Sequence, residues 1–183
     1  MAGVGANKIN IMRKIKVKVL TDGCAPVISD NGDWIDLRTA EEVNLKAPWA
    51  GLLNRREQET RKVTFESHLV PLGVAMQLPD GYEGHIVLRS SANKNFGIIS
   101  ANHIGIVDNS YKGDNDQWFI PVIALRDTTI PKGSRICQFR VALSQKATFW
   151  QRVRHLFTGG VKIELVDELG NPDRGGHGTS GVA

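Results

Sequence analysis

The sequence predicts an all-β domain, either a barrel or a sandwich of short strands. Lysines alternate with Ile15, Val17 and Val19, which is the two-residue period of a half-buried strand. Further short apolar segments follow at regular spacing, with glycine, aspartate and asparagine turns between them. The chain has 183 residues, 41% of them apolar and 23% charged, so one hydrophobic core is expected and two would be crowded.

The expected strands follow one another at short intervals. After the first strand, residues 32–45 contain a turn and a second short strand. Residues 65–91 are expected to form a strand, a turn at Pro79-Asp80-Gly81 and another strand. The remaining strands are expected within residues 96–108, 117–127, 134–143 and 161–169.

Two segments depart from this pattern and predict short helices. Residues 52–62 are rich in helix-forming side chains. Residues 148–157 place five large apolar side chains on one face at helical spacing: Phe149, Trp150, Val153, Leu156 and Phe157. Each helix either covers the core or presents a face that binds a protein partner, and the first alternative is favoured.

The ends of the chain differ in composition from its middle. Residues 1–12 are small and polar and predict a flexible arm, so the β domain is expected to occupy residues 13–170. Residues 171–183 contain too many glycines for a regular element and predict an arm that is mobile until a ligand orders it.

Charge and cysteine usage restrict the function classes. The net charge is +4 and the pI about 9.2, but the basic residues are scattered, which favours a solvated surface over a nucleic-acid-binding patch. Cys24 and Cys137 lie in apolar surroundings without metal-like spacing, which predicts buried thiols. No apolar segment approaches membrane-spanning length and no signal peptide is visible, so we expect a cytoplasmic protein without membrane contact.

Three separated segments share the chemistry of phosphate binding. Each has small residues, groups that donate hydrogen bonds and one arginine: Arg89-Ser90-Ser91, Gly133-Ser134-Arg135 with Gln138, and Arg174-Gly175-Gly176 continuing to Thr179-Ser180-Gly181. Glycines let backbone N–H groups approach a ligand, and guanidinium and hydroxyl groups bind phosphate oxygens. One such segment alone is more often a surface turn, but three in one small domain favour a phosphate site.

Two acids and a tyrosine complete the set of chemically suggestive residues. Asp108 ends an apolar segment before a turn, so it either initiates that turn or takes a proton from water. Tyr111 either packs at the edge of the core or supports a sugar ring. Asp36 alternates with apolar neighbours and either faces solvent or helps to hold Mg²⁺ near a triphosphate.

The order of these segments resembles the five motifs of the homotrimeric dUTPases over about residues 15–183. The matching segments are GDWIDLRTAE, LRSSANKNFGI, ANHIGIVDNSYKGD, GSRICQF and DRGGHGTSG. The sequence is most similar to a bacterial and bacteriophage branch in which the first motif reads DWIDLR and the third continues as YKGDND. Residues 48–67 and 144–161 look like insertions relative to the compact family pattern.

The resemblance implies a jelly-roll-like β fold, a homotrimer with active sites shared between subunits, and Mg²⁺-dependent hydrolysis of dUTP to dUMP and pyrophosphate. Asp108 would be the general base for the attacking water, and Asp36 would support the water shell of the metal. The phosphates would contact Arg89, Ser90, Ser91, Gln138, Arg174, Gly178, Thr179 and Ser180. The base and sugar would contact Asn102, Gly105, Ile106 and Tyr111.

One position departs from the family pattern. The glycine-rich motif usually carries an aromatic residue that caps the base, and His177 occupies that position here. Either this imidazole stacks on the base, or Trp118 or Phe119 replaces it. The two aromatic residues point to opposite faces of a strand, and Phe119 is preferred.

Two alternatives to a dUTPase remain from the sequence. A dCTP deaminase shares the fold and the phosphate motifs, but Tyr111 after Asp108 fits a dUTPase better. A regulatory binding protein on the same scaffold would use the inserted segments, particularly residues 148–157, to contact a partner.

Overall fold

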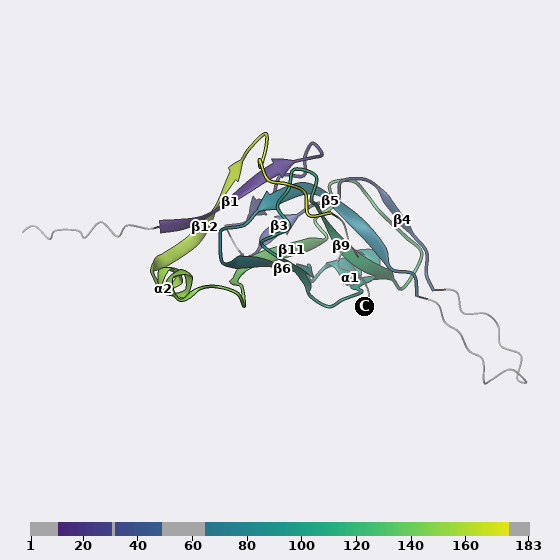
Figure 1. Cartoon of the computed structure of the whole chain (residues 1–183). Coiled ribbons are helices and arrows are strands. Elements are labelled where there is room, and N and C mark those ends of the chain that lie inside the picture. Colours follow the sequence, from purple (N-terminus) through teal and green to yellow (C-terminus); the bar gives the residue numbers. More distant parts are fainter. Residues whose placement is uncertain (1–10, 31, 49–64, 176–183) are drawn as a thin grey trace, which may run out of the picture.

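Two packed β-sheets form the molecule, as the alternating apolar pattern predicts (Figure 1). The computed structural model describes residues 11–30, 32–48 and 65–175. The elements in chain order are β1 (Ile11–Val19), β2 (Val27–Ile28), β3 (Ile35–Leu37), β4 (Val43–Leu45), β5 (His68–Gln77), β6 (Tyr82–Leu88), α1 (Ala92–Phe96), β7 (Ile98–Ser100), β8 (Gly105–Val107), β9 (Gln117–Ala124), β10 (Thr128–Ile130), β11 (Cys137–Leu143), α2 (Phe149–Phe157) and β12 (Thr158–Leu165).

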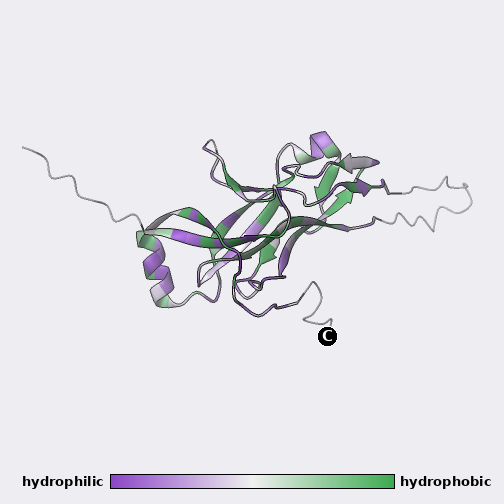
Figure 2. Cartoon of the chain, turned by 90° about the horizontal axis from the view of Figure 1, so that it is seen from above, coloured by the Kyte–Doolittle hydropathy of each residue, from purple (hydrophilic) through white to green (hydrophobic). Residues whose placement is uncertain are grey.

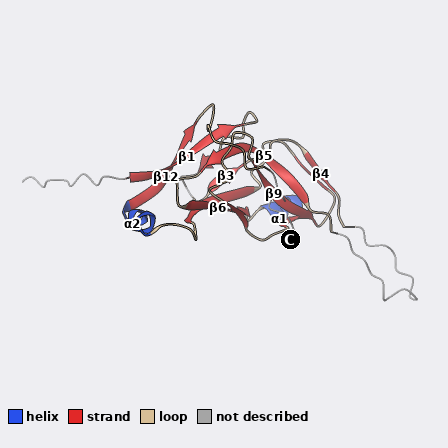
Figure 3. Cartoon of the chain, in the orientation of Figure 1, coloured by secondary structure: helices blue, strands red, loops and turns tan. Residues whose placement is uncertain are grey.

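The strand order explains which elements are neighbours. One five-stranded sheet has the order β12-β1-β5-β9-β7, and the other has the order β2-β3-β11-β6-β8. A two-stranded pair joins β10 and β4. All pairings are antiparallel except that of β1 with β12, which is parallel. The predicted all-β architecture is confirmed, and strands dominate the view coloured by secondary structure (Figure 3).

The core lies between the two five-stranded sheets. Strand β9 alternates half-buried and buried side chains along its whole length, so Trp118 faces inward and Phe119 lies on the opposite face. The Trp118 ring meets Phe139 of β11 edge-on at 5.1 Å between centroids, an arrangement that the ring quadrupoles favour. Apolar residues accordingly concentrate on the strands (Figure 2).

Strand β5 is bent where proline and glycine interrupt its sequence. The pairing with β9 shifts between Pro71 and Ala75, and Gly73 between them has φ 64°. A side chain there would meet the Cys24 thiol at 2.9 Å, so glycine satisfies both the backbone angle and the space. Cys24 and Cys137 are buried free thiols, as predicted, and burial raises the pKa of each.

Helix α2 has the predicted position but not the expected role. It covers residues 149–157 and begins at a capping box in which Thr148 and Gln151 bond to each other's backbone. None of its residues is buried, and Trp150 is 75% exposed. The expectation that this helix covers core is therefore wrong. Phe149, Trp150, Leu156 and Phe157 are all exposed, whereas Val153 is half-buried. The helix lies at the end of the molecule opposite β4 (Figure 1).

Other sequence expectations have mixed outcomes. The helix predicted at residues 52–62 lies outside the described residues, as do residues 1–10 of the predicted arm 1–12 and residues 176–183 of the predicted arm 171–183. Strand β1 begins at Ile11, two residues before the expected start of the domain. The sequence reading missed β2, β10 and the five-residue α1. No described helix is long and apolar enough to cross a membrane.

Candidate active site

Residues predicted to bind phosphate gather at one end of the second sheet. Strand β11 places Gln138 opposite Asp36 of β3 and Val87 of β6. Arg89 follows β6 directly, and its backbone N–H donates to the Ile136 carbonyl at 2.9 Å. We call this group the phosphate cluster; it consists of Asp36, Arg89, Ser90, Ser91, Arg135 and Gln138.

Asp36 is the buried centre of the phosphate cluster. It is only 2% exposed, and its two carboxylate oxygens accept hydrogen bonds from Arg89 and from Arg135, the latter at 3.2 Å. The alternative that Asp36 faces solvent is therefore wrong. A buried carboxylate needs such partners, because an unpaired charge in the interior is costly. Asp36 thus holds two guanidinium groups side by side.

The serines of the cluster are open to a ligand. Ser90 and Ser91 are exposed in the turn between β6 and α1, and Ser91 is the residue that precedes the helix. The Ser91 side chain makes no capping hydrogen bond to α1, so its hydroxyl is not committed to the helix. Arg135 was named in the sequence segment but not among the predicted site residues. Its ion pair with Asp36 identifies it as a missed member.

The residues predicted for the base, sugar and water lie on a different part of the second sheet. Strand β8 is an edge strand that pairs only with β6, so one edge of its backbone faces outward. We call residues 102–111 the Asp108 segment. It includes Gly105, where an added side chain would clash with Ile86 of β6, which explains why this position requires glycine.

Asp108 is accessible and charge-paired. Its side chain is 57% exposed, and its Oδ2 accepts a hydrogen bond from Arg174 Nη1 at 3.1 Å. The next residue, Asn109, donates to the carbonyls of Leu78, Pro79 and Tyr82 and so fixes the backbone beside Asp108. The Asp108 carbonyl accepts from the Tyr111 N–H at 3.0 Å, so the turn uses the backbone of Asp108 and leaves its carboxylate accessible.

The Tyr111 side chain anchors the end of the Asp108 segment to the rest of the domain. Its hydroxyl donates to the Gln117 carbonyl at 2.7 Å, and its ring packs against the core. Burial, with Asp116 as the next cause, raises the pKa of Tyr111, so the phenol stays protonated and remains a donor. Asn102 is exposed and its amide oxygen accepts from Ser100.

An acidic loop that the sequence reading did not interpret holds the C-terminal arm. Asp114 accepts from the backbone N–H groups of Leu169 and Gly170 and from Lys18 Nζ, and these bonds lower its pKa. Asp116 is 2% exposed and accepts from the N–H groups of Arg174 and Gly175. These contacts place Arg174 beside Asp108. The signal in the sequence was the segment GDND, residues 113–116, which follows Tyr111 and Lys112 and contains both aspartates.

The aromatic alternatives for capping the base are partly resolved. Trp118 is 1% exposed and belongs to the core, so it is excluded as the cap. Phe119 is half-buried on the opposite face of β9. His177, Gly178, Thr179 and Ser180 lie outside the described residues.

The two halves of the predicted site are far apart within one chain. The pairing of Gly84 with Val107 puts Asp108 at the beginning of β6, whereas Arg89 follows its other end. About six residues of strand separate the two positions, which is roughly 20 Å at the usual rise. Asp108 and Arg89 therefore lie at opposite ends of β6 within one chain.

Comparison with known proteins identifies the family. The sequence profile of the dUTPase family matches residues 51–159. The SPbeta prophage-derived deoxyuridine 5'-triphosphate nucleotidohydrolase of Bacillus subtilis is 47% identical over 170 residues, which cover 92% of this chain and 99% of that protein.

Solved structures share the fold at low sequence identity. The dUTPase from Streptococcus mutans has a TM-score of 0.55 at 21% identity and covers 70% of this chain and 94% of its own. A mutant dUTPase from phage phi11 of S. aureus, described with a structural Mg(II) ion, has a TM-score of 0.55 at 16% identity, covering 74% and 94%. The chain belongs to the dUTPase family, whose enzymes hydrolyse dUTP to dUMP.

Proposed function

We propose that this dUTPase hydrolyses dUTP to dUMP and pyrophosphate by direct water attack on the α-phosphorus, with Asp108 as the general base. The exposed Asp108 carboxylate takes a proton from the attacking water. The new bond forms between the water oxygen and the α-phosphorus. The bond from the α-phosphorus to the bridging oxygen breaks, and pyrophosphate leaves with that electron pair.

The phosphate cluster supplies the positive charge that this reaction needs. Arg89, Ser90, Ser91 and Gln138 bind the phosphates, and Arg135 adds a second guanidinium group beside Arg89. Support comes from Asp36, which fixes both guanidinium groups in place before a ligand arrives. Preorganised donors stabilise developing charge more effectively than groups that must first reorient.

The open edge of β8 suits recognition of the base. In an antiparallel edge strand the N–H and C=O groups of alternate residues face away from the neighbouring strand, so one of the consecutive residues Gly105 and Ile106 offers the donor and acceptor pattern that a uracil edge requires. Asn102 adds an amide, Tyr111 packs under the deoxyribose, and Phe119 or His177 caps the base.

Mg²⁺ fits this site as an ion carried mainly by the triphosphate. Among the residues that the structure describes, no group of three or more histidine, cysteine, aspartate or glutamate side chains could hold a metal. Mg²⁺ prefers oxygen ligands and keeps several waters, so phosphate oxygens would supply most of its ligands. Asp36, whose two oxygens accept from Arg89 and Arg135, would contribute only through water. When bound, the ion neutralises charge on the phosphates.

The arm completes the site by closing over the γ-phosphate through Arg174 and the backbone of Gly178, Thr179 and Ser180. The observed Arg174–Asp108 pair supports this role, because the arm already reaches the Asp108 segment. The cytoplasmic location and the partner-binding role of residues 148–157 stay predictions. The outward apolar face of α2 supports the second of these.

A homotrimer with shared sites explains the separation of the two halves. Asp108 and Arg89 lie at opposite ends of β6 within a single chain. In a closed threefold arrangement, the phosphate cluster of one subunit faces the Asp108 segment of the next. The pairing register of β6 with β8 is the observation on which the proposed shared site rests.

Replacement of Asp108 by asparagine tests the mechanism. We expect Asp108→Asn to reduce kcat by about 10²–10⁴-fold, because the water loses its general base. Binding of a non-hydrolysable dUTP analogue should persist, since the amide keeps the shape of the carboxylate. A variant with wild-type kcat would remove Asp108 from the mechanism.

A further inference from the structure

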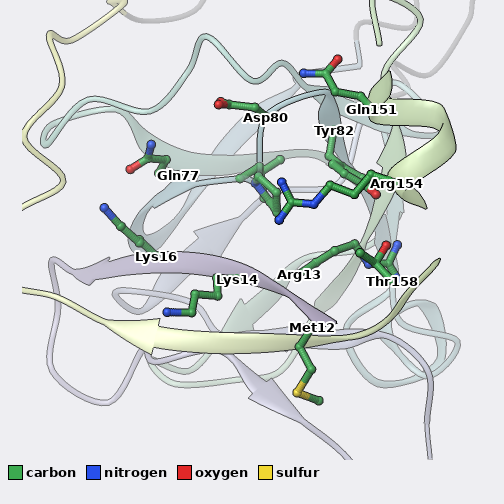
Figure 4. Close-up of a pocket in the computed structure, with 12 residues that line it drawn as sticks. Met12, Arg13, Lys14, Lys16, Gln77, Asp80, Tyr82, Gln151, Arg154 and Thr158 are labelled. Carbon is green, nitrogen blue, oxygen red and sulfur yellow. The ribbon is translucent and has the colours of Figure 1, made fainter. Parts of the chain in front are cut away.

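One cavity of the structure lies outside the predicted nucleotide site. It has a volume of about 580 Å³ and lies between β1, the turn Pro79–Gly81 and α2 (Figure 4). This volume is within the usual range of small-molecule sites, about 300–1,000 Å³. None of the described residues predicted to bind dUTP lines the cavity.

The charged residues that line this cavity are mostly cationic. Figure 4 shows β1 on one side, the turn with Asp80 on another, and Arg154 extending from α2 into the space between them. Four lining side chains are cationic, namely Arg13, Lys14, Lys16 and Arg154, and Asp80 is the one acidic residue among them. Lys14 is partly neutralised by Glu164 at 3.7 Å.

Arg13 is held in position for a ligand. Its guanidinium carbon lies 5.6 Å from the centre of the Tyr82 ring, and its Nε donates to the Gly160 carbonyl at 3.1 Å. These two contacts orient the group and leave its two terminal nitrogens without a hydrogen bond to another described residue. Arg154 and Lys16 likewise have no ion pair within the described part of the chain.

The orientation of α2 agrees with a cavity that binds anions. Its inward side carries polar residues, and the Tyr82 hydroxyl lies 3.0 Å from His155 Nδ1. Gln151 and Arg154 line the cavity, while the large apolar residues of the helix point outward. The helix therefore contributes a charged wall instead of core packing.

We propose that this cavity is a second anion site that binds a di- or triphosphate group. Two guanidinium groups, those of Arg13 and Arg154, line the cavity together with lysines and one aspartate, and guanidinium groups match phosphate oxygens in pairs. The phosphate group is either free pyrophosphate or the polyphosphate of a nucleotide. The site is independent of the proposed catalytic roles, because no residue is shared.

Calorimetric titration of the full-length protein with tripolyphosphate tests this site. The catalytic site is first saturated with a non-hydrolysable imido analogue of dUTP, so that remaining heat reports a second site. We expect saturable binding to the wild type, and affinity weakened about tenfold or more in Arg154→Gln and in Lys16→Gln. Lys146→Gln, which removes an exposed charge next to the same helix, is the matched control and should bind as the wild type.

Parallel titrations with pyrophosphate and with dTTP distinguish the two sources of the phosphate group. Tighter binding of pyrophosphate assigns the site to the free anion, and tighter binding of dTTP assigns it to a nucleotide. The proposal is overturned if the saturated wild type binds none of the three probes. It is also overturned if both cavity variants bind as tightly as the Lys146→Gln control.

Discussion

Asp36 shows how one buried residue determines the chemistry of a surface site. Its carboxylate is almost completely buried, yet both of its partners, Arg89 and Arg135, are partly exposed. The acid therefore acts as an internal anchor, and the guanidinium groups present their remaining donors outward. Any role of Asp36 toward the water shell of a metal adds to this anchoring.

Replacement of Asp36 by asparagine should weaken both stability and phosphate binding. Asp36→Asn removes the charge that two arginines share, and a hydrogen bond to a charged group contributes about 1.5–3 kcal/mol. We expect a decrease of that order in the free energy of unfolding, measured by denaturant titration, together with a higher KM for dUTP. Asp33→Asn, three residues earlier at an exposed position, should change neither quantity.

The alternation of apolar and polar residues along the strands predicted some of these side-chain positions and missed others. It placed Trp118 and Phe119 on opposite faces of a strand, which the structure confirms. It did not show which face meets the core, because that depends on the second sheet. All three residues of β3 are buried, so its burial does not alternate. Arg89 and Arg135, which donate to Asp36, are separated from it by 53 and 99 positions in the chain.

At the scale of elements, helix α2 shows why a periodic apolar pattern does not determine which side of a helix is buried. The spacing predicted a helix over 148–157, and the helix is present. The same spacing fits an apolar face turned toward a core or toward a partner. Here the polar side of the helix contacts the domain, as in the contact of His155 on α2 with the Tyr82 hydroxyl of β6.

Two tryptophan substitutions should distinguish an apolar side chain on the outward face of α2 from one in the core. Trp150 is 75% exposed, so Trp150→Ala should change the free energy of unfolding by less than about 0.5 kcal/mol. Trp118 is in the core, so Trp118→Ala should cost about 3–5 kcal/mol. Thermal or denaturant unfolding measures both variants. A large loss for Trp150→Ala would show that its apolar face is covered in the assembled protein.

The acidic loop and the C-terminal arm form a second functional element. The sequence predicted an arm that is mobile until a ligand orders it, whereas the described residues up to Gly175 are bonded to Asp114 and Asp116. Glycine content indicates intrinsic flexibility, but it cannot reveal hydrogen-bond acceptors supplied by a loop more than fifty positions away.

Replacement of Asp116 by asparagine should loosen this part of the arm. Asp116→Asn leaves one acceptor oxygen for the N–H groups of Gly113, Arg174 and Gly175. An unsatisfied buried donor costs about 1–3 kcal/mol, so amide hydrogen exchange at Arg174 and Gly175 should become faster. Asp167→Asn, at an exposed position, serves as the control. Unchanged exchange would mean that other contacts hold the arm.

At the scale of the whole molecule, the fold separates two kinds of chemistry along strand β6. The five motifs predicted the family from sequence, and the order of the strands then supports the proposal that two chains form each site. The linear order of motifs could not show this, because Arg89 and Asp108 are near in sequence but lie at opposite ends of a strand.

Mixed oligomers should reveal whether the sites are shared. In the proposed homotrimer, Asp108→Asn and Arg89→Ala would each disable one half of every site when present in all subunits. When the two variants are unfolded and refolded together, some sites combine an intact Asp108 with an intact Arg89 from a neighbour. We expect turnover above that of either variant alone. No recovery in demonstrably mixed trimers would place both residues in the same chain's site.

Pyrophosphate release across dUTP, dTTP, dCTP and UTP, with and without Mg²⁺, tests the central claim most directly. The account predicts that dUTP is strongly preferred, that Mg²⁺ is required for full turnover, and that the product is dUMP. In the proposed site, Tyr111 and the edge of β8 would provide the physical basis for that preference. Equal turnover of the four nucleotides, or release of ammonia from dCTP without cleavage of dUTP, would contradict it.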